Sequence, residues 1–240
     1  RGGSLKVTEL FERLDRQFGA GVIGLVAFLG VVFIAFSLTS PQFLSVANFD
    51  SIAFQLPELG LLTLAMLMPI ISGGFNLAII YTANICGLTL AWVLMQYGGV
   101  DAGLPAFILG SVAAIAVGAL AGCIMGLVIA YIGAHPILVS LAMMIFLRGL
   151  GEFLTRGGDI SGFPDFLKVI GHGHLVGVPV PLILFFLAVI VWHVLLTRTR
   201  HGFSVYMIGS NIKGANYSGI HTKRTLTLIY TLSEIGRAHV

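Results

Sequence analysis

The chain has 240 residues, of which 57% are hydrophobic and only 10% are charged, with a formal net charge of +3 and a mean hydropathy of +1.00. A soluble domain carries about 25% charged residues, so this composition excludes an ordinary soluble protein. No Lys or Arg occurs between residues 17 and 147, and such a stretch can face lipid but not water. Long continuous apolar runs also exclude a membrane β-barrel. The sequence therefore predicts an all-α, polytopic transmembrane helical bundle, and it has no aromatic-interleaved basic patch that would suggest a nucleic-acid partner.

Residues 1–19 are predicted to form a cytoplasmic N-terminal tail. Apolar residues at helical spacing over residues 5–18 favour an amphipathic helix on the membrane surface, and a solvated tail is the equal alternative.

Residues 20–233 form the predicted membrane domain. We expect six complete spans and a truncated seventh that starts at 225: 20–38, 56–72, 77–96, 105–131, 137–154 and 179–196. With the N-terminus inside, the basic N-terminal tail and the basic loop 197–224 fall on one side, as the positive-inside rule requires. The outer loops then include 39–55, and Glu58 would lie in the first turn of the second span, after Pro57.

Both ends of the chain differ from those expected of a complete protein. The chain begins at Arg1, and the last apolar run stops after nine residues, too short to cross a membrane. The tail 234–240 can be read as the translation of a common sequencing adaptor, so we expect it to be non-native.

A break in the hydrophobic sequence at residues 72–76, Ser-Gly-Gly-Phe-Asn, provides the candidates for a polar path across the membrane. A broken helix exposes backbone groups that can line such a path. A tight turn with interhelical hydrogen bonds is the even alternative. The candidate pathway residues are Gly73, Gly74, Asn76, Tyr81 and Asn84.

Other features favour structural roles. Gly118, Gly122 and Gly126 recur every four residues, which predicts close helix packing. Arg148 and Glu152 are four apart, which favours a local ion pair over a functional role. The two cysteines lie in apolar segments, where free thiols are expected.

Nothing in the sequence suggests catalysis or metal binding. The histidines show no convergent ligand spacing, and His172 and His174 give only a weak metal signal. No phosphate-binding GxxxxGK[ST] loop occurs. We predict no catalytic residues, no metal site and no cofactor bound by this chain.

The loop 197–224 is polar, glycine-punctuated and basic, with five of the thirteen Lys and Arg residues. It belongs on the cytoplasmic side, and its core at residues 211–219 could present a short helix to a soluble partner.

The chain resembles the permease subunits of bacterial ABC importers for simple sugars, of the ribose, autoinducer-2 and galactoside type. The likeness covers about residues 40–233 and rests on motifs in order. These are Ser40–Phe43, Asn48–Phe49, Gly73–Gly74, Ala134–Leu141, Arg148–Gly149, Gly158–Pro164, His201–Asn211, Ala215 and Ser218–Ile220.

The resemblance implies a permease in the bacterial inner (plasma) membrane that couples the motion of a partner ATPase to translocation of a sugar or small polar solute. Its partners would be cytoplasmic ABC ATPase subunits that hold ATP and Mg, a second permease copy or paralogue, and an extracytoplasmic solute-binding protein. The resemblance places ATPase coupling on Asn211, Lys213, Ala215, Asn216, Ser218 and Gly219. Where the family has an aspartate after the Gly-Gly turn, this chain has Asn76, which leaves the choice of substrate open.

Three alternatives remain. A related importer permease could carry branched-chain amino acids or nucleosides. A secondary transporter driven by an ion gradient would favour a buried carboxylate in its path. An intramembrane enzyme is disfavoured because no catalytic constellation is present.

Overall fold

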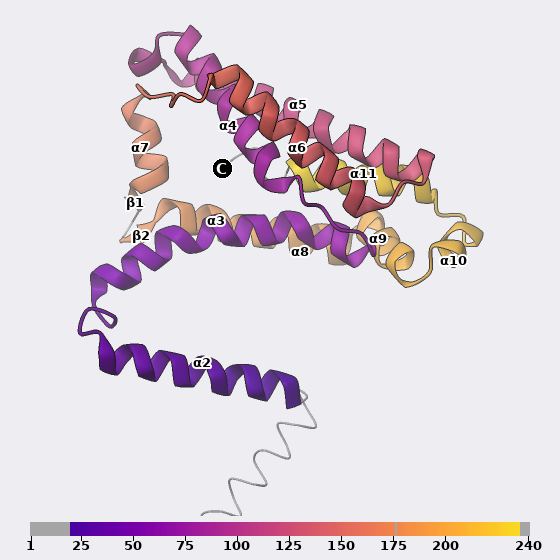
Figure 1. The fold of residues 1–240 in the computed structure, drawn as a ribbon, viewed down its shortest axis with the longest axis horizontal. Helices are drawn as coiled ribbons and strands as arrows, with labels where there is room; N and C mark the ends of the chain where they lie inside the picture. Colours follow the sequence, from indigo (N-terminus) through magenta and orange to yellow (C-terminus); the bar gives the residue numbers. More distant parts are fainter. Residues whose placement is uncertain (1–19, 176, 236–240) are drawn as a thin grey trace, which may run out of the picture. The chain divides into compact units, whose positions relative to one another are not determined.

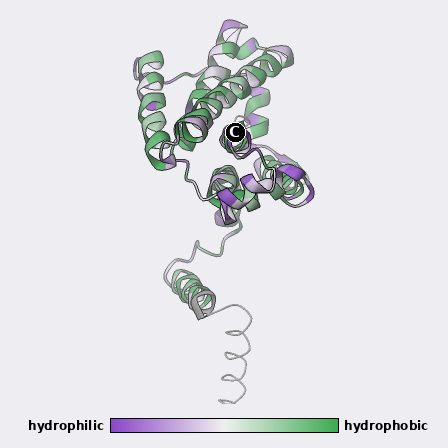
Figure 2. Ribbon diagram, turned by 90° about the vertical axis from the view of Figure 1, so that its right-hand side faces the viewer, coloured by the Kyte–Doolittle hydropathy of each residue, from purple (hydrophilic) through white to green (hydrophobic). Residues whose placement is uncertain are grey.

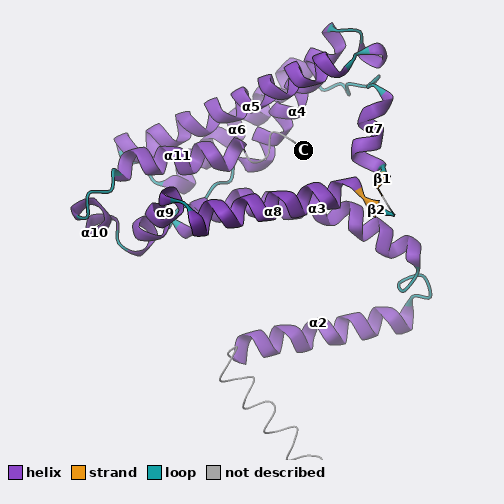
Figure 3. Cartoon of the chain, turned by 180° about the vertical axis from the view of Figure 1, so that it is seen from behind, coloured by secondary structure: helices purple, strands orange, loops and turns teal. Residues whose placement is uncertain are grey.

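The computed structural model describes residues 20–175 and 177–235, which are almost entirely helical (Figures 1 and 3). The all-α prediction is confirmed: in these ranges the only sheet pairs β1 (His174–Leu175) with β2 (Val178–Pro179). The possible amphipathic helix at 5–18 and the tail from 236 lie outside the described residues. The chain divides into two compact units, residues 1–52 and 53–240.

The first unit contains α2 (Ala20–Thr39) and the beginning of α3 (Val46–Ile71). The Phe43 ring packs edge-on against Phe33 and stacks on Phe36. The Ser45 hydroxyl accepts a hydrogen bond from the Asn48 amide, the interaction of a helix N-cap. This cap starts α3 ten residues before the predicted span, so the prediction of a loop over all of 39–55 was wrong.

The same early start moves Pro57 and Glu58 into the middle of α3. The prediction that Glu58 occupies a first helical turn was therefore wrong, and the helix dipole does not explain this carboxylate. Pro57 and Pro69 both lie inside the helix, which a membrane helix tolerates because neighbouring segments satisfy the freed backbone groups.

The second unit holds the rest of α3 and the remaining helices. These are α4 (Ile79–Gln96), η1 (Gly99–Asp101), α5 (Leu104–Leu127), the π-helical turn η2 (Val128–Ile132), α6 (Pro136–Thr155), α7 (Asp165–His172), α8 (Val180–Arg198), α9 (Arg200–Ser210), α10 (Ile212–Tyr217) and α11 (Thr222–Ile235). Proline stands in the first turn of α5, α6 and α8, where its missing N–H costs no hydrogen bond.

Within the described ranges, five helices are long and apolar enough to cross a membrane: α3, α4, α5 with η2, α6 and α8. Hydrophobic residues predominate along the helical ribbon (Figure 2), and many large apolar side chains are exposed, as expected where lipid is the solvent. The chain is thus a multi-pass helical membrane protein. Helix α11 has 14 residues, and α2 is not among these five, so the count of six complete spans and a truncated seventh stays a prediction.

Close packing of α5 against α11 forms the centre of the second unit. Added β-carbons on Gly122 and Gly126 would collide with the backbone of α11 at Tyr230 and Thr227. Gly118 packs against the Cys86 sulfur and the backbone of Glu234. The predicted role of this glycine stripe in helix packing is confirmed.

The connections of the second unit gather at two ends. At one end, the turn after α4 meets the loop before α7, with Phe163 and Leu167 packed on Leu94 and Ala102. Towards the other end, a buried core joins α3, η2, α8, α9 and α11 through Met68, Ile129, Leu196, Val205, Ile229 and Tyr230.

Candidate coupling segment and membrane break

Helix α9 is fixed to the ends of two membrane helices through glycines. The Thr199 hydroxyl accepts a hydrogen bond from the Gly202 amide at 3.1 Å and caps the helix. A β-carbon on Gly202 would collide with the Leu196 carbonyl at the end of α8, and one on Gly209 would collide with the Ile71 carbonyl at the end of α3. Val205, between these two glycines, is fully buried, so α9 packs closely on the ends of both helices.

His201 lies half-buried in the first turn of α9. Its Nε2 atom is shielded from water and finds no hydrogen-bond partner among the described residues. Burial lowers the pKa of His201 below its ordinary value, because the charged imidazolium is poorly solvated there. The neutral ring is therefore the form that suits this position.

The short helix predicted within residues 211–219 is confirmed as α10. Asn211 caps it, because its side-chain oxygen accepts a hydrogen bond from the Gly214 amide at 3.0 Å. Ala215 is fully buried, whereas Lys213 and Asn216 are exposed and the Tyr217 side chain is 94% exposed. Gly219 ends the segment with a φ of 80°, a conformation that favours glycine.

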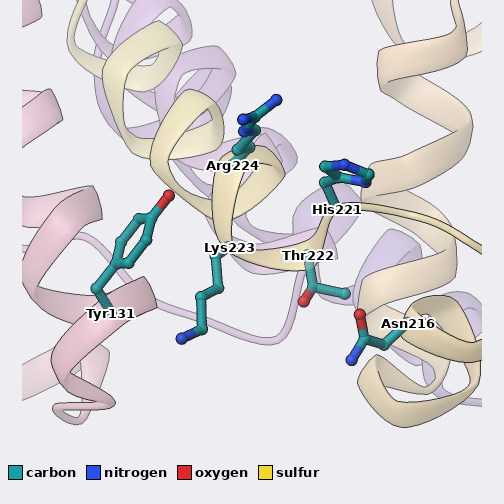
Figure 4. Close-up of a pocket in the computed structure, with 6 residues that line it drawn as sticks. All are labelled: Tyr131, Asn216, His221, Thr222, Lys223 and Arg224. Carbon is teal, nitrogen blue, oxygen red and sulfur yellow. The ribbon is translucent and has the colours of Figure 1, made fainter.

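A shallow hollow lies beside α10. Figure 4 shows Tyr131 of η2 facing the first turn of α11, with Asn216 of α10 on the other side. The Lys223 ammonium lies 5.3 Å from the centre of the Tyr131 ring. His221, Thr222 and Arg224 complete the lining, so this surface is basic and polar.

Exposed Phe203 and Tyr206 on α9 add aromatic surface, so α9 and α10 together can offer both charge and apolar area to a partner.

The predicted interruption of the membrane helices is confirmed between the end of α3 at Ile71 and the start of α4 at Ile79. Gly73 has a φ of 82°, which a side chain would disfavour. An added β-carbon on Gly74 would collide with the Tyr230 hydroxyl. Both glycines are thus needed by the turn.

Asn76 is fully buried at this break and is hydrogen-bonded on both sides of its amide. Its oxygen accepts from the Ala78 amide at 3.0 Å. Its nitrogen donates to the Ser233 hydroxyl at 3.3 Å and to a Glu234 carboxylate oxygen at 2.6 Å. The Ser233 hydroxyl donates to the Ala65 carbonyl at 2.7 Å. Asn76 therefore ties α3 and α4 to α11, the interhelical alternative that its sequence left open, and its place in a pathway stays a prediction.

Tyr81 and Asn84, the remaining two pathway candidates, lie within α4, on its side towards α6. Tyr81 packs against the core between α4, α5 and α6, and Asn84 is exposed next to Gly151 of α6. The Arg148 guanidinium lies 6.0 Å from the centre of the Tyr81 ring and donates to Glu152 at 2.9 Å, which confirms the predicted ion pair. The structure thus separates Asn76 from Tyr81 and Asn84.

Sequence reasoning missed Gly202, Gly209 and Ile71, which fix α9 to the bundle. Glycines inside a helical pattern were the available signal, because they mark close backbone approach. The pair His172 and His174 lies against the Phe54 ring, and the described residues contain no cluster of three or more His, Cys, Asp or Glu side chains that could hold a metal.

Comparison with known proteins places these features in a family context. Residues 48–235 match the profile of a family described as the permease component of branched-chain amino acid transport systems. The chain is 30% identical over 221 residues to the autoinducer 2 import system permease protein LsrD of Photorhabdus laumondii, covering 89% of this chain and 64% of that protein. It is 32% identical over 187 residues to the LsrD protein of Yersinia enterocolitica, covering 75% and 54%.

The chain thus spans roughly half to two thirds of the length of these relatives. Solved structures offer no match to it.

Proposed function

The chain belongs to the family of permease components described for branched-chain amino acid transport systems, and we propose that it is the membrane-spanning subunit of an ATP-driven importer. Its solute would be a simple sugar or related small polar molecule, since the similar LsrD proteins carry the name of an autoinducer 2 import system. The chain itself would perform no covalent chemistry, and ATP and Mg would bind to separate ATPase subunits.

The observation that carries this proposal is the construction of α9 and α10. Their outer side offers Phe203, Tyr206, Lys213 and Tyr217 to a soluble partner. The inner side of α9 lies against the ends of α3 and α8, and α10 follows directly after α9. A push on this segment would therefore move membrane helices and would not be absorbed by a flexible loop.

A movement of α9 would be transmitted to the break between α3 and α4. Gly209 contacts Ile71, which lies directly before the turn, and Asn76 joins the turn to α11. Displacing the end of α3 would shift this hydrogen-bonded turn. We assign the alternation between outward-open and inward-open states to such rigid movements of helices.

The orientation follows from charge. The end that carries α10 holds Arg198, Arg200, Lys213, Lys223 and Arg224, so we place it in the cytoplasm, with the N-terminus on the same side. At the opposite end, Arg156 and Lys168 are balanced by Asp159 and Asp165, and Lys168 donates to Asp165 at 2.7 Å. The complete importer would also contain a second permease and an extracytoplasmic solute-binding protein.

Uptake in reconstituted vesicles tests this proposal. We expect uptake to require the permease, the ATPase and the binding protein together, and to stop with vanadate. Uptake that persists without ATPase and responds to a proton or sodium gradient would instead identify a secondary transporter.

A second candidate solute class is branched-chain amino acids, because the matching family is described by them. Calorimetry with the purified binding protein separates the two. Binding of ribose but not leucine supports the sugar, and binding of leucine but not ribose supports the amino acid.

A further inference from the structure

A polar face on α4 and α6 stands out from the apolar surface around it. It consists of Tyr81, Asn84, Arg148 and Glu152. The Arg148 and Glu152 side chains are 61% and 64% exposed, although both lie within a helix that is long and apolar enough to cross the membrane. Charged groups in that setting are costly against lipid, so they face water or other protein.

The four residues are brought together by the packing of α4 on α6. Arg148 lies over the Tyr81 ring. Asn84 has its amide oxygen next to Gly151, where an added β-carbon would lie only 3.5 Å away. Because Arg148 and Gly151 are three residues apart, they share one side of α6. The Asn84 amide therefore lies on the side of α6 that carries Arg148.

The hydrogen-bonding capacity of this face is largely unused. Within residues 20–175 and 177–235, the Asn84 amide makes no hydrogen bond, and Arg148 donates through Nε to Glu152 and also contacts Tyr81. Arginine has five N–H donors and an amide offers both donors and an acceptor. The Arg148–Glu152 pair is neutral overall, so the face suits an uncharged solute rich in oxygen.

The face also lies away from α9 and α10, the helices proposed to contact the ATPase. Arg148 lies twelve residues into α6, or about 18 Å along the helix from Pro136. Asn84 lies near the start of α4, six residues after Ala78 and the hydrogen-bonded turn of Asn76. A solute path that crosses the membrane beside the break between α3 and α4 would therefore pass Asn84 and Arg148.

We propose that Tyr81, Asn84, Arg148 and Glu152 line the water-filled path and contact the hydroxyl groups of the passing solute. This inference rests on the proposed importer function. It adds the charged pair to the pathway and assigns the ligand class as neutral, polyhydroxylated molecules.

Thiol labelling tests whether this polar face is accessible to water. Asn84→Cys would report on the face, and Phe146→Cys provides a control on the opposite side of α6, where the Phe146 side chain is exposed among apolar neighbours. The chain is placed in lipid nanodiscs and treated with a charged, membrane-impermeant methanethiosulfonate. We expect Asn84→Cys to react about tenfold faster than Phe146→Cys, because thiolates form and react in water. Equal rates would overturn the proposal.

A second measurement distinguishes a transport path from a static wet surface. The labelling rate of Asn84→Cys is measured in the complex with the ATPase, before and after trapping with ADP and vanadate. We expect a change of at least about threefold, because the path opens and closes with the ATPase. Gly171→Cys, on α7, checks that the reagent is equally active in both states.

The outcomes separate the two hypotheses. If no ATPase binds the chain, the proposed importer function fails, while labelling of the chain alone still decides whether the face is wet. If the ATPase binds and traps ADP but the rate at Asn84→Cys stays constant, the importer function stands and the assignment of this face is wrong.

Discussion

Gly209 of α9 lies against the backbone carbonyl of Ile71 at the end of α3, with no room between them for a methyl group. The two residues are far apart in the sequence. Their contact joins the segment proposed to receive force from an ATPase to the membrane helix that leads into the break at residues 72–78.

Filling this contact should destabilise the protein. For Gly209→Ala we expect a loss of about 1–3 kcal/mol in unfolding free energy, because neither backbone can yield easily. Gly149→Ala is the control, since its added β-carbon meets nothing and alanine favours the helix by about 1 kcal/mol. Thermal unfolding in detergent measures both. A Gly209→Ala variant as stable as Gly149→Ala would show that α9 does not dock as described.

The cap of α10 should be measurable on its own. Asn211→Ala removes the acceptor of the Gly214 amide hydrogen bond and should cost about 1 kcal/mol of local helix stability. Hydrogen exchange of the amides at 213–217 should then accelerate about fivefold. Asn216→Ala is the control, because the Asn216 side chain makes no hydrogen bond within the described part of the chain. Equal exchange in the two variants would contradict the cap.

The docking of α9 should weaken in acid. Burial lowers the pKa of His201, so the unfolded segment binds a proton more readily than the folded one. The resulting stability is present above the unfolded pKa of about 6.5 and is lost as the pH falls towards the lower folded value. Hydrogen exchange in α9, corrected for its intrinsic pH dependence, should report more opening at pH 5.5 than at pH 7.5. The same pH dependence in His201→Gln would rule out this imidazole as its source.

Reversing a charge on α9 or α10 should weaken ATPase binding only modestly. Arg200 and Lys213 are exposed, and exposed ion pairs contribute about 0–1 kcal/mol. Arg200→Glu or Lys213→Glu should therefore weaken ATPase binding by less than about tenfold, with a smaller effect at high salt. Surface plasmon resonance at two salt concentrations measures this. Complete loss of binding with either variant would show that a buried ion pair, and not the helix itself, dominates the contact.

The sequence alone predicted the helical class, the break at residues 72–76, the short helix at α10 and the Gly118–Gly126 stripe. Each follows from a local feature of the sequence: the length of the apolar runs, the glycines in the break, the polar, glycine-punctuated loop and the four-residue spacing of the stripe. The start of α3 was missed because Ser45 caps a helix whose first ten residues are partly polar. Glycines in a helical pattern can mark a close approach, but that Gly209 meets Ile71 and that Asn76 bonds to α11 depends on tertiary packing, which a local pattern does not specify.

The central claim is that α10 docks on a partner ATPase, and a proline substitution tests it most directly. The Ala215 amide donates to the Asn211 carbonyl at 2.8 Å, so Ala215→Pro removes this bond and should cost about 3 kcal/mol within the helix. Ile212→Pro is the matched control: it stands at the first helical position, and Asn211 before it already has the extended backbone that proline requires. Ile212→Ala controls for loss of the side chain.

The measurement is co-purification of the ATPase with each variant from membranes, alongside thermal unfolding to confirm that the bundle is intact. The account predicts that Ala215→Pro loses most of the ATPase, while Ile212→Pro retains it to the level of Ile212→Ala. Full retention of the ATPase by a folded Ala215→Pro variant would contradict the claim.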